Sequence, residues 1–218
     1  MKFLIFGPPG AGKGTYSTRL QDILGIAAIS TGDIFREAIE NGTELGKKVK
    51  SYVESGELVP DEITSKVLKK RLEQHDAKKG FILDGYPRTL KQANDLGKIT
   101  KIDAVINLIV PEWVIIERLS SRRVCPVCGT IYNIRFLKPK VDELCDKDGA
   151  KIIQRDDDKP EVIKDRLRIY EEATKPLLEF FKKKKIEFVN IECNDVDIPP
   201  EIMVDKILKS LKEKKLIE

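Results

Sequence analysis

The residues best suited to chemistry lie in a glycine-rich stretch near the start of the chain, Gly7–Thr15. An apolar run, Phe3–Phe6, precedes it, and a sequence compatible with a helix follows it. Glycines allow backbone N–H groups to point inward at an anion, and the helix that begins there adds its dipole. A strand, a G-x-x-x-x-G-K loop and a helix in this order predict a phosphate-binding loop, in which Lys13 reaches the β- and γ-phosphates of a nucleotide. The alternative is a strand-to-helix turn without a ligand.

A second group of charged residues could hold a metal ion and further phosphates. Asp84 ends an apolar strand, where a carboxylate helps to hold Mg²⁺ in enzymes with such a loop, although it could instead cap a helix. Arginine binds phosphate in a bidentate manner, and several arginines occur in loops rather than on solvated helix faces. They are Arg36, Arg88, Arg122, Arg123 and Arg155. Each alone could form a surface ion pair, but together they suit phosphoryl transfer between two polyanions.

A general base is hard to find in this sequence. His75 is the only histidine, and we expect it at the surface because it lies at the polar end of a predicted helix. A phosphate acceptor needs no base, since its oxygens are already ionised near neutral pH. An alcohol acceptor would more often use an aspartate or histidine.

Three of the four cysteines form a pattern typical of metal binding. Sixteen residues separate the C-x₂-C pair, Cys125 and Cys128, from the C-x₂-D pair, Cys145 and Asp148. This spacing predicts zinc held by three thiolates and one carboxylate, with no open position and hence a structural role. The alternatives are free thiols or an eroded site held by packing. We expect Cys193 to be a small buried hydrophobic residue.

Composition restricts the class of protein. The 218 residues are 41% hydrophobic, which suits one globular α/β unit with inserted subdomains. The formal net charge of +4, from 40 basic and 36 acidic residues, does not argue for a nucleic-acid partner. We find no apolar run of membrane-span length and no signal-peptide pattern, so we expect a cytoplasmic protein without membrane contact. Cysteines in that compartment favour metal binding or free thiols over disulfides.

Hydrophobic patterns predict the elements that position these residues. The expected strands are Lys2–Phe6, Ile26–Ile29, Phe81–Asp84, Ala104–Val110 and Glu187–Ile191. The expected helices are Gly12–Leu24, Asp33–Asn41, Thr43–Ser55, Asp61–His75, Thr89–Leu96, Glu112–Ser121, Pro160–Lys183 and Pro199–Lys215. Apolar strands that alternate with helices predict a parallel sheet covered on both faces. Three consecutive helices indicate a helical insertion around residues 30–59, and residues 122–159 have the pattern of short strands and turns.

Taken together, these motifs resemble the adenylate kinase family, in its long-lid bacterial type with a zinc-binding lid, over essentially the whole chain. The stretches that carry the resemblance are Gly7–Thr15, Thr31–Arg36, Gly56–Asp61, Asp84–Thr89 with Gln92, Arg118–Arg123 and Arg155–Asp158. Gly14, which separates Lys13 from Thr15, matches the G-x-P-G-x-G-K-G-T form of nucleoside monophosphate kinases.

The resemblance implies a P-loop NTPase fold of three α/β/α layers with a five-stranded parallel sheet. Residues 1–29, 60–121 and 160–218 would form the core, 30–59 a helical AMP-binding domain, and 122–159 a small β-rich lid. The implied reaction is ATP + AMP ⇌ 2 ADP, with Mg²⁺ accompanying ATP and structural Zn²⁺ in the lid. The protein is expected to be a monomer that binds neither nucleic acid nor membrane.

The resemblance also implies roles for individual residues. The expected ATP-binding residues are Gly10, Ala11, Gly12, Lys13, Gly14, Thr15, Arg118, Arg122, Ile131, Tyr132 and Asn194. The expected AMP-binding residues are Thr31, Arg36, Glu57, Leu58, Val59, Gly85, Tyr86, Pro87, Arg88, Gln92, Arg155 and Arg166, with Gln92 contacting the adenine. Catalytic roles are implied for Lys13, Asp84, Arg88, Arg122, Arg155 and Arg166. The implied metal ligands are Cys125, Cys128, Cys145 and Asp148.

Two alternatives remain at this point. One is a kinase of the same fold with a UMP, CMP or GMP acceptor, although the pyrimidine enzymes have short lids and Gln92 argues against them. The other is a zinc-ribbon ATPase that binds nucleic acid, which the near-even charge and the lack of interleaved basic and aromatic residues in 122–159 disfavour.

Overall fold

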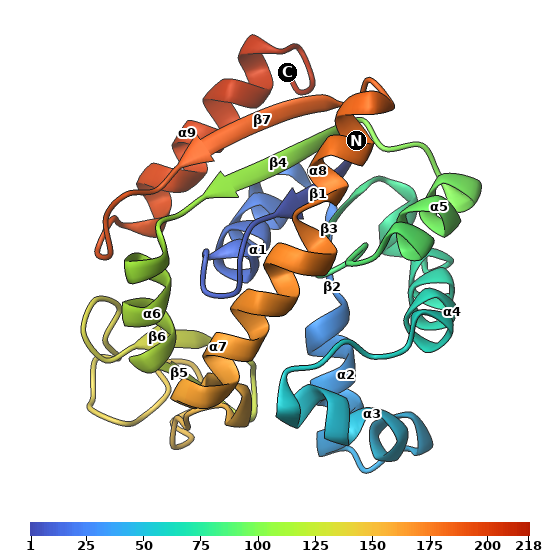
Figure 1. The fold of residues 1–218 in the computed structure, drawn as a ribbon. Coiled ribbons are helices and arrows are strands. Elements are labelled where there is room, and N and C mark those ends of the chain that lie inside the picture. Colours follow the sequence, from blue (N-terminus) through green and yellow to red (C-terminus); the bar gives the residue numbers. More distant parts are fainter.

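The computed structural model describes residues 1–218. A parallel sheet of five strands in the order β2-β3-β1-β4-β7 forms the centre (Figure 1). Its strands are β1 (Lys2–Phe6), β2 (Ala27–Ser30), β3 (Phe81–Asp84), β4 (Ala104–Ile109) and β7 (Glu187–Glu192). The predicted five-stranded parallel sheet is therefore confirmed, with boundaries shifted by one residue at most.

Strand β1 shows how the sheet acquires two apolar faces. Side chains alternate across a strand, so Phe3 and Ile5 face one side while Leu4 and Phe6 face the other. Helices α1 (Lys13–Leu24) and α9 (Pro200–Glu213) cover the first face. Helices α4 (Asp61–Leu72), α5 (Leu90–Ile99) and α8 (Leu177–Lys183) supply core residues on the second face. This arrangement confirms the three layers.

A small helical segment leaves the sheet after β2. It contains α2 (Thr31–Glu40), capped by the Ser30 hydroxyl, and α3 (Glu44–Ser55), capped by the Thr43 hydroxyl. It has its own core of Phe35, Val49 and Val59. The following helix α4 ends at Leu72, before the predicted end at His75, which starts a 3₁₀ turn and is exposed as expected.

Residues 122–159, called the β5–β6 segment below, follow α6 (Glu112–Ser120) and lie apart from the main sheet. Strands β5 (Arg122–Val124) and β6 (Ile131–Asn133) pair antiparallel, as the expectation of short strands and turns required. Their core consists of Cys125, Tyr132, Cys145 and Ile152. In Figure 1 this segment and α2–α3 lie on either side of α7, on the same side of the sheet.

The single helix predicted over Pro160–Lys183 is interrupted in the structure. Helix α7 (Pro160–Ile169) passes into a π-helical turn, Tyr170–Thr174, and α8 begins after Pro176. Proline has no N–H to donate, and the Lys175 N–H reaches five residues back to the Tyr170 carbonyl at 2.8 Å. None of the helices in the chain is long and apolar enough to cross a membrane.

The close approach of α2 and α3 depends on Gly46. A Cβ at this position would lie 2.0 Å from the Ala38 carbonyl oxygen, whereas a Cβ at Gly97 on the exposed face of α5 would meet nothing within 4 Å. Gly46→Ala should therefore lower the free energy of unfolding by about 3 kcal/mol. Gly97→Ala should raise it by about 1 kcal/mol, because alanine restricts the unfolded chain and favours the helix. Denaturant titration of both variants measures the change in the free energy of unfolding. An unchanged free energy of unfolding in Gly46→Ala would contradict the close packing of α2 and α3 at this position.

Candidate active site

A cavity of about 240 Å³ opens at the carboxyl ends of the strands, between the main sheet, the α2–α3 segment and the β5–β6 segment. The register of the parallel strands explains its position. Asp84 at the end of β3 pairs with Ile5 of β1 on one side and with Ser30 of β2 on the other. The glycine-rich loop and the start of α2 therefore leave the sheet on opposite sides of Asp84, which lines the cavity between them.

The glycine-rich loop adopts a conformation that only glycine allows at two points. Gly10 and Gly12 have φ of +80° and +93°, and a Cβ would lie 2.8 Å from Leu119 or 2.7 Å from the Tyr16 ring. Helix α1 begins at Lys13, and the Lys13 ammonium donates to the carbonyls of Gly7 and Pro8 at 2.8 and 2.9 Å. Burial lowers the pKa of Lys13 to about 8. The loop thus presents a buried cation and a helix N-terminus to the cavity.

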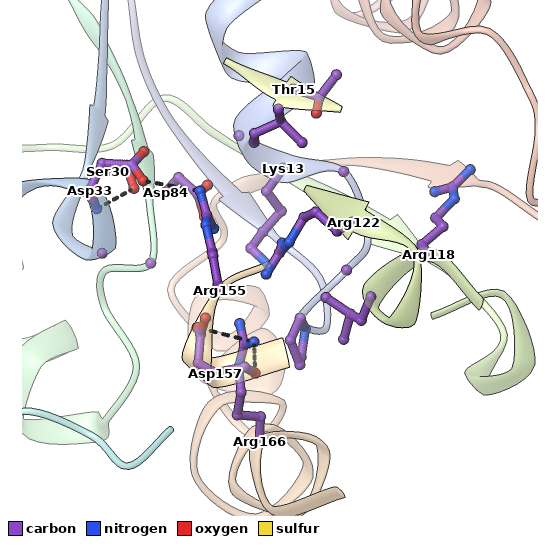
Figure 2. A pocket seen from close by; sticks show the side chains of 18 of the residues that line it. Lys13, Thr15, Ser30, Asp33, Asp84, Arg118, Arg122, Arg155, Asp157 and Arg166 are labelled. Carbon is purple, nitrogen blue, oxygen red and sulfur yellow. Dashed lines mark hydrogen bonds and ion pairs between the residues drawn. The ribbon is translucent and has the colours of Figure 1, made fainter. Parts of the chain in front are cut away.

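Cationic side chains from distant parts of the chain converge opposite this loop. The cavity is lined by Lys13, Arg36, Arg88, Arg118, Arg122, Arg155 and Arg166. Figure 2 shows Lys13, Arg122, Arg155 and Arg166 extending toward one another from α1, the start of β5, the segment before α7, and α7 itself. Burial, with the nearby charges of Arg36 and Arg122, lowers the pKa of Arg155 to about 9. Burial also lowers the pKa of Arg166 to about 10.

Carboxylates compensate some of this charge. Asp158 is fully buried and accepts from Arg122 Nε and Nη2 at 2.8 and 2.6 Å, and from Arg166 Nη1 at 3.2 Å. Asp157 pairs with Arg166 at 3.1 Å. These ion pairs fix the orientation of two guanidinium groups before any ligand is present.

Arg155 is compensated least. Its Nε is the only buried side-chain nitrogen or oxygen that has no hydrogen-bond partner. The nearest acidic partner recorded for it, Asp33 of α2, lies 3.9 Å from its Nη2 and also pairs with Arg36. A buried cationic donor without a partner is costly, so this part of the cavity is built for an anion.

A different set of contacts organises the side of the cavity near α4 and α5. The Gln92 amide lies between the carboxylate of Asp61 and the backbone N–H of Arg88, each at 2.7 Å. The Thr31 hydroxyl donates to the Gly85 carbonyl at 2.9 Å. Apolar residues of the α2–α3 segment and the loop after it line this side, namely Phe35, Val53, Leu58 and Val59.

Most residues expected to bind nucleotide do line this one cavity, and four do not. Ala11 is fully buried behind the loop. Tyr86 and Pro87 line a smaller adjoining cavity of about 70 Å³, which they share with Lys13 and Arg88. Asn194 is exposed outside the cavity, whereas Val196, Asp197 and Ile198 beyond it are part of the lining.

Sequence reasoning assigned no role to several residues that shape the site. Asp33 and Asp157 pair with arginines in the lining, and Asp158 holds Arg122 from behind. Arg118 donates to the carbonyls of Asp195 and Val196 and to the Cys193 sulfur, which is buried as expected. Asp157 and Asp158 follow Arg155 closely in the sequence, and this proximity could have indicated that they pair with arginines of the site. Nothing in the sequence links position 118 to 193–196.

The four predicted metal ligands meet in one place. The three sulfurs and a carboxylate oxygen of Asp148 all lie within 4.8 Å of one another. The Gly129 N–H donates to the Cys125 carbonyl and the Gly149 N–H to the Cys145 carbonyl, so both pairs sit on turns of the same kind. Four ligands at this spacing fit a tetrahedral metal ion. Tyr132 lines the main cavity and donates its hydroxyl to the Cys145 sulfur at 3.4 Å, which links the cluster to the cavity.

Known proteins similar in sequence to this chain are adenylate kinases. A model of the adenylate kinase family matches residues 5–186. An adenylate kinase of Archaeoglobus fulgidus is 50% identical over 191 residues, covering 85% of this chain and 88% of the relative. One of Thermotoga petrophila is 51% identical over 193 residues, covering 85% and 88%. One of Caldanaerobacter subterraneus subsp. tengcongensis is 46% identical over 218 residues, covering 98% and 95%. The chain belongs to the adenylate kinase family.

Proposed function

We propose that the protein transfers the terminal phosphoryl group of ATP to AMP, giving two ADP, and catalyses the reverse reaction. The observation that carries this proposal is the unpartnered Arg155 Nε, buried among the other cations of the cavity. The triphosphate of ATP and the phosphate of AMP, meeting there, would supply the missing anion. The phosphate-binding loop on one side and Arg36 and Arg88 on the other would then hold donor and acceptor.

The residues divide into roles according to their positions. Lys13 and the N–H groups of the loop would bind the donor phosphates, while Arg122, Arg155 and Arg166 stabilise the charge that develops during transfer. Asp84 would help to hold Mg²⁺, which neutralises and orients the donor phosphates when bound. No histidine lines the cavity, and an ionised phosphate acceptor requires no general base.

We expect Zn²⁺ to occupy the Cys125, Cys128, Cys145 and Asp148 cluster, where it holds the β5–β6 segment together. That segment and the α2–α3 segment would move as a lid and an AMP-binding domain, and their closure would exclude water from the transfer. The protein would act as a cytoplasmic monomer with ATP, AMP and ADP as its partners, and bind neither nucleic acid nor membrane.

Acceptor choice tests the reaction directly. With MgATP as donor, AMP should be phosphorylated with a kcat/KM at least about tenfold above that of GMP, CMP or UMP, because the polar groups around Gln92 are matched to one base. Chromatography of the nucleoside diphosphates formed measures this. Equal rates with all four acceptors would contradict an adenine-specific acceptor site. Release of inorganic phosphate from ATP while the monophosphate acceptor stays unphosphorylated would contradict transfer.

Binding of MgATP should weaken above about pH 8. The buried Lys13 of the free protein has a pKa of about 8, whereas a bound phosphate favours its charged form and raises that pKa. Below pH 8 the lysine is already protonated and affinity is constant. Above it, binding must take up a proton, so affinity falls by up to about tenfold per pH unit. Calorimetry in two buffers with different ionisation enthalpies measures the proton uptake.

The matched control for this experiment is Lys13→Arg, whose guanidinium stays charged over the same range. Its MgATP affinity should be lower but should lose the decline that begins near pH 8. The same decline in both proteins would assign the titration to another group.

Removal of the metal should destabilise the β5–β6 segment and weaken ATP binding together. Chelation should lower Tm by about 5 °C or more, equivalent to about 2 kcal/mol, because the small core of that segment depends on the four ligands. The KM for ATP should rise more than the KM for AMP, since Tyr132 joins Cys145 to the cavity. Added Zn²⁺ should reverse both effects, and an unchanged Tm after verified removal of the metal would contradict a structural role.

A further inference from the structure

Gln92 is held at both ends of its side-chain amide. Its Oε1 accepts from the backbone N–H of Arg88 at 2.7 Å, and its Nε2 donates to Oδ1 of Asp61 at 2.7 Å. Gln92 is only 2% exposed, and it lines the cavity. An amide has two donor hydrogens and an acceptor oxygen with two lone pairs. One donor and one lone pair of this amide therefore remain for a ligand.

Asp61 determines which end of the amide faces which partner. An ionised carboxylate only accepts hydrogen bonds, so the Gln92 end beside it must be the NH₂ group. Asp61 is itself fixed by the Thr89 hydroxyl, which lies 3.0 Å from both carboxylate oxygens. The backbone N–H of Arg88, a donor only, imposes the same orientation from the other end. Rotation of the amide by 180° would oppose like groups at both ends.

We propose that Asp61 is a positioning residue that makes the acceptor site select adenine over 6-oxopurines by locking the orientation of the Gln92 amide. This inference rests on the proposed function, in which Gln92 contacts the base of the acceptor nucleotide. It assigns to Asp61 a part in specificity without contact to the substrate.

The chemistry of the purine edge makes the orientation of the amide decisive. Adenine presents an acceptor at N1 beside a donor at the 6-amino group. Hypoxanthine and guanine present the reverse, a donor at N1 beside an acceptor at O6. A freely rotating amide could pair with either edge, because rotation exchanges its own donor and acceptor. A locked amide pairs with the adenine edge but places donor against donor and acceptor against acceptor on a 6-oxopurine edge. In a buried site this mismatch discriminates strongly against the 6-oxopurine.

The surroundings of the amide make the penalty effective. Phe35, Val53, Leu58 and Val59 supply apolar surface to the same cavity, and a polar group of the base left without a partner against such surface is costly. Thr64 lines the same cavity, and its single hydroxyl hydrogen is directed to the carbonyls of Val59 and Pro60, each 3.2 Å away.

Asp61→Asn removes the constraint at the Nε2 end with little change of shape, since asparagine can either accept from or donate to Gln92. The Arg88 N–H alone then opposes rotation of the amide, so the lock is weakened. IMP is the appropriate probe, because it inverts the N1 and C6 edge of AMP without the extra 2-amino group of GMP. With MgATP as donor, the ratio of kcat/KM for AMP to kcat/KM for IMP should fall by about tenfold in this variant. The change should lie in the KM values for the acceptors, while the KM for ATP and the kcat with saturating AMP stay as in the parent.

Glu62→Gln is the matched control. It removes the same charge from the same first turn of α4, but Glu62 is exposed and its carboxylate forms an ion pair only with Lys91, at 3.3 Å. Any effect through the helix dipole should be equal in both variants, so Glu62→Gln should leave the AMP/IMP ratio unchanged. Asp61→Glu keeps an acceptor-only group and should retain most of the selectivity, which guards against an Asp61→Asn protein that folds poorly.

A double-mutant cycle separates positioning from a general structural role. If Asp61 acts through Gln92, Asp61→Asn should not change the AMP/IMP ratio further in a Gln92→Leu background. The inference is overturned if Asp61→Asn reduces kcat/KM for AMP and IMP by the same factor, or if its effect on the ratio persists without Gln92. A parent protein that forms no diphosphate from AMP would instead overturn the proposed function, so the two failures are distinguishable.

Discussion

The structure depends on buried positive charge gathered at the carboxyl ends of the sheet. Arg122, Arg155 and Arg166 come from the β5–β6 segment and α7, and all are largely withdrawn from solvent. Buried cations are tolerated only where carboxylates or ligands compensate them. Asp158 does so for Arg122 and Arg166, while Arg155 retains a donor without a partner. An anionic ligand beside Arg155 would supply the missing partner and, by binding only the folded protein, would stabilise it.

The same constraint explains how the chain is divided. The core sheet holds the glycine-rich loop and Asp84 rigidly, because β1, β2 and β3 pair in a register that is buried on both faces. The remaining cations come from segments with small cores of their own, α2–α3 and β5–β6. Segments with few buried contacts are the ones that can move at low free energy. In the proposed function, a rigid loop for the donor phosphates and movable segments for the remaining cations would suit a reaction that must admit two nucleotides and then exclude water.

Polar contacts outside the arginine cluster fix the orientation of other side chains that line the cavity. Asp61 and Thr89 orient the Gln92 amide, and the 193–196 region orients Arg118. Tyr132 connects the metal cluster to the cavity in the same way. In each case a second residue fixes the direction of a donor before the ligand arrives, which reduces the entropy that binding must remove.

The sequence by itself was enough to predict the parallel sheet, the strand, glycine-rich loop and helix around Gly7–Thr15, and the clustering of Cys125, Cys128, Cys145 and Asp148. Each depends on residues close together in the chain, such as Gly7–Thr15 or the two C-x₂-C/D pairs, whose spacing reflects local backbone geometry. Only the tertiary structure decided that Asp158 pairs with Arg122, that Asp61 pairs with Gln92, and that Asn194 lies outside the cavity. These pairs are 36 and 31 positions apart, so their contact depends on how whole helices and strands pack. Local patterns carry no record of that packing, because any arginine or aspartate exposed on its own element has the same local signature.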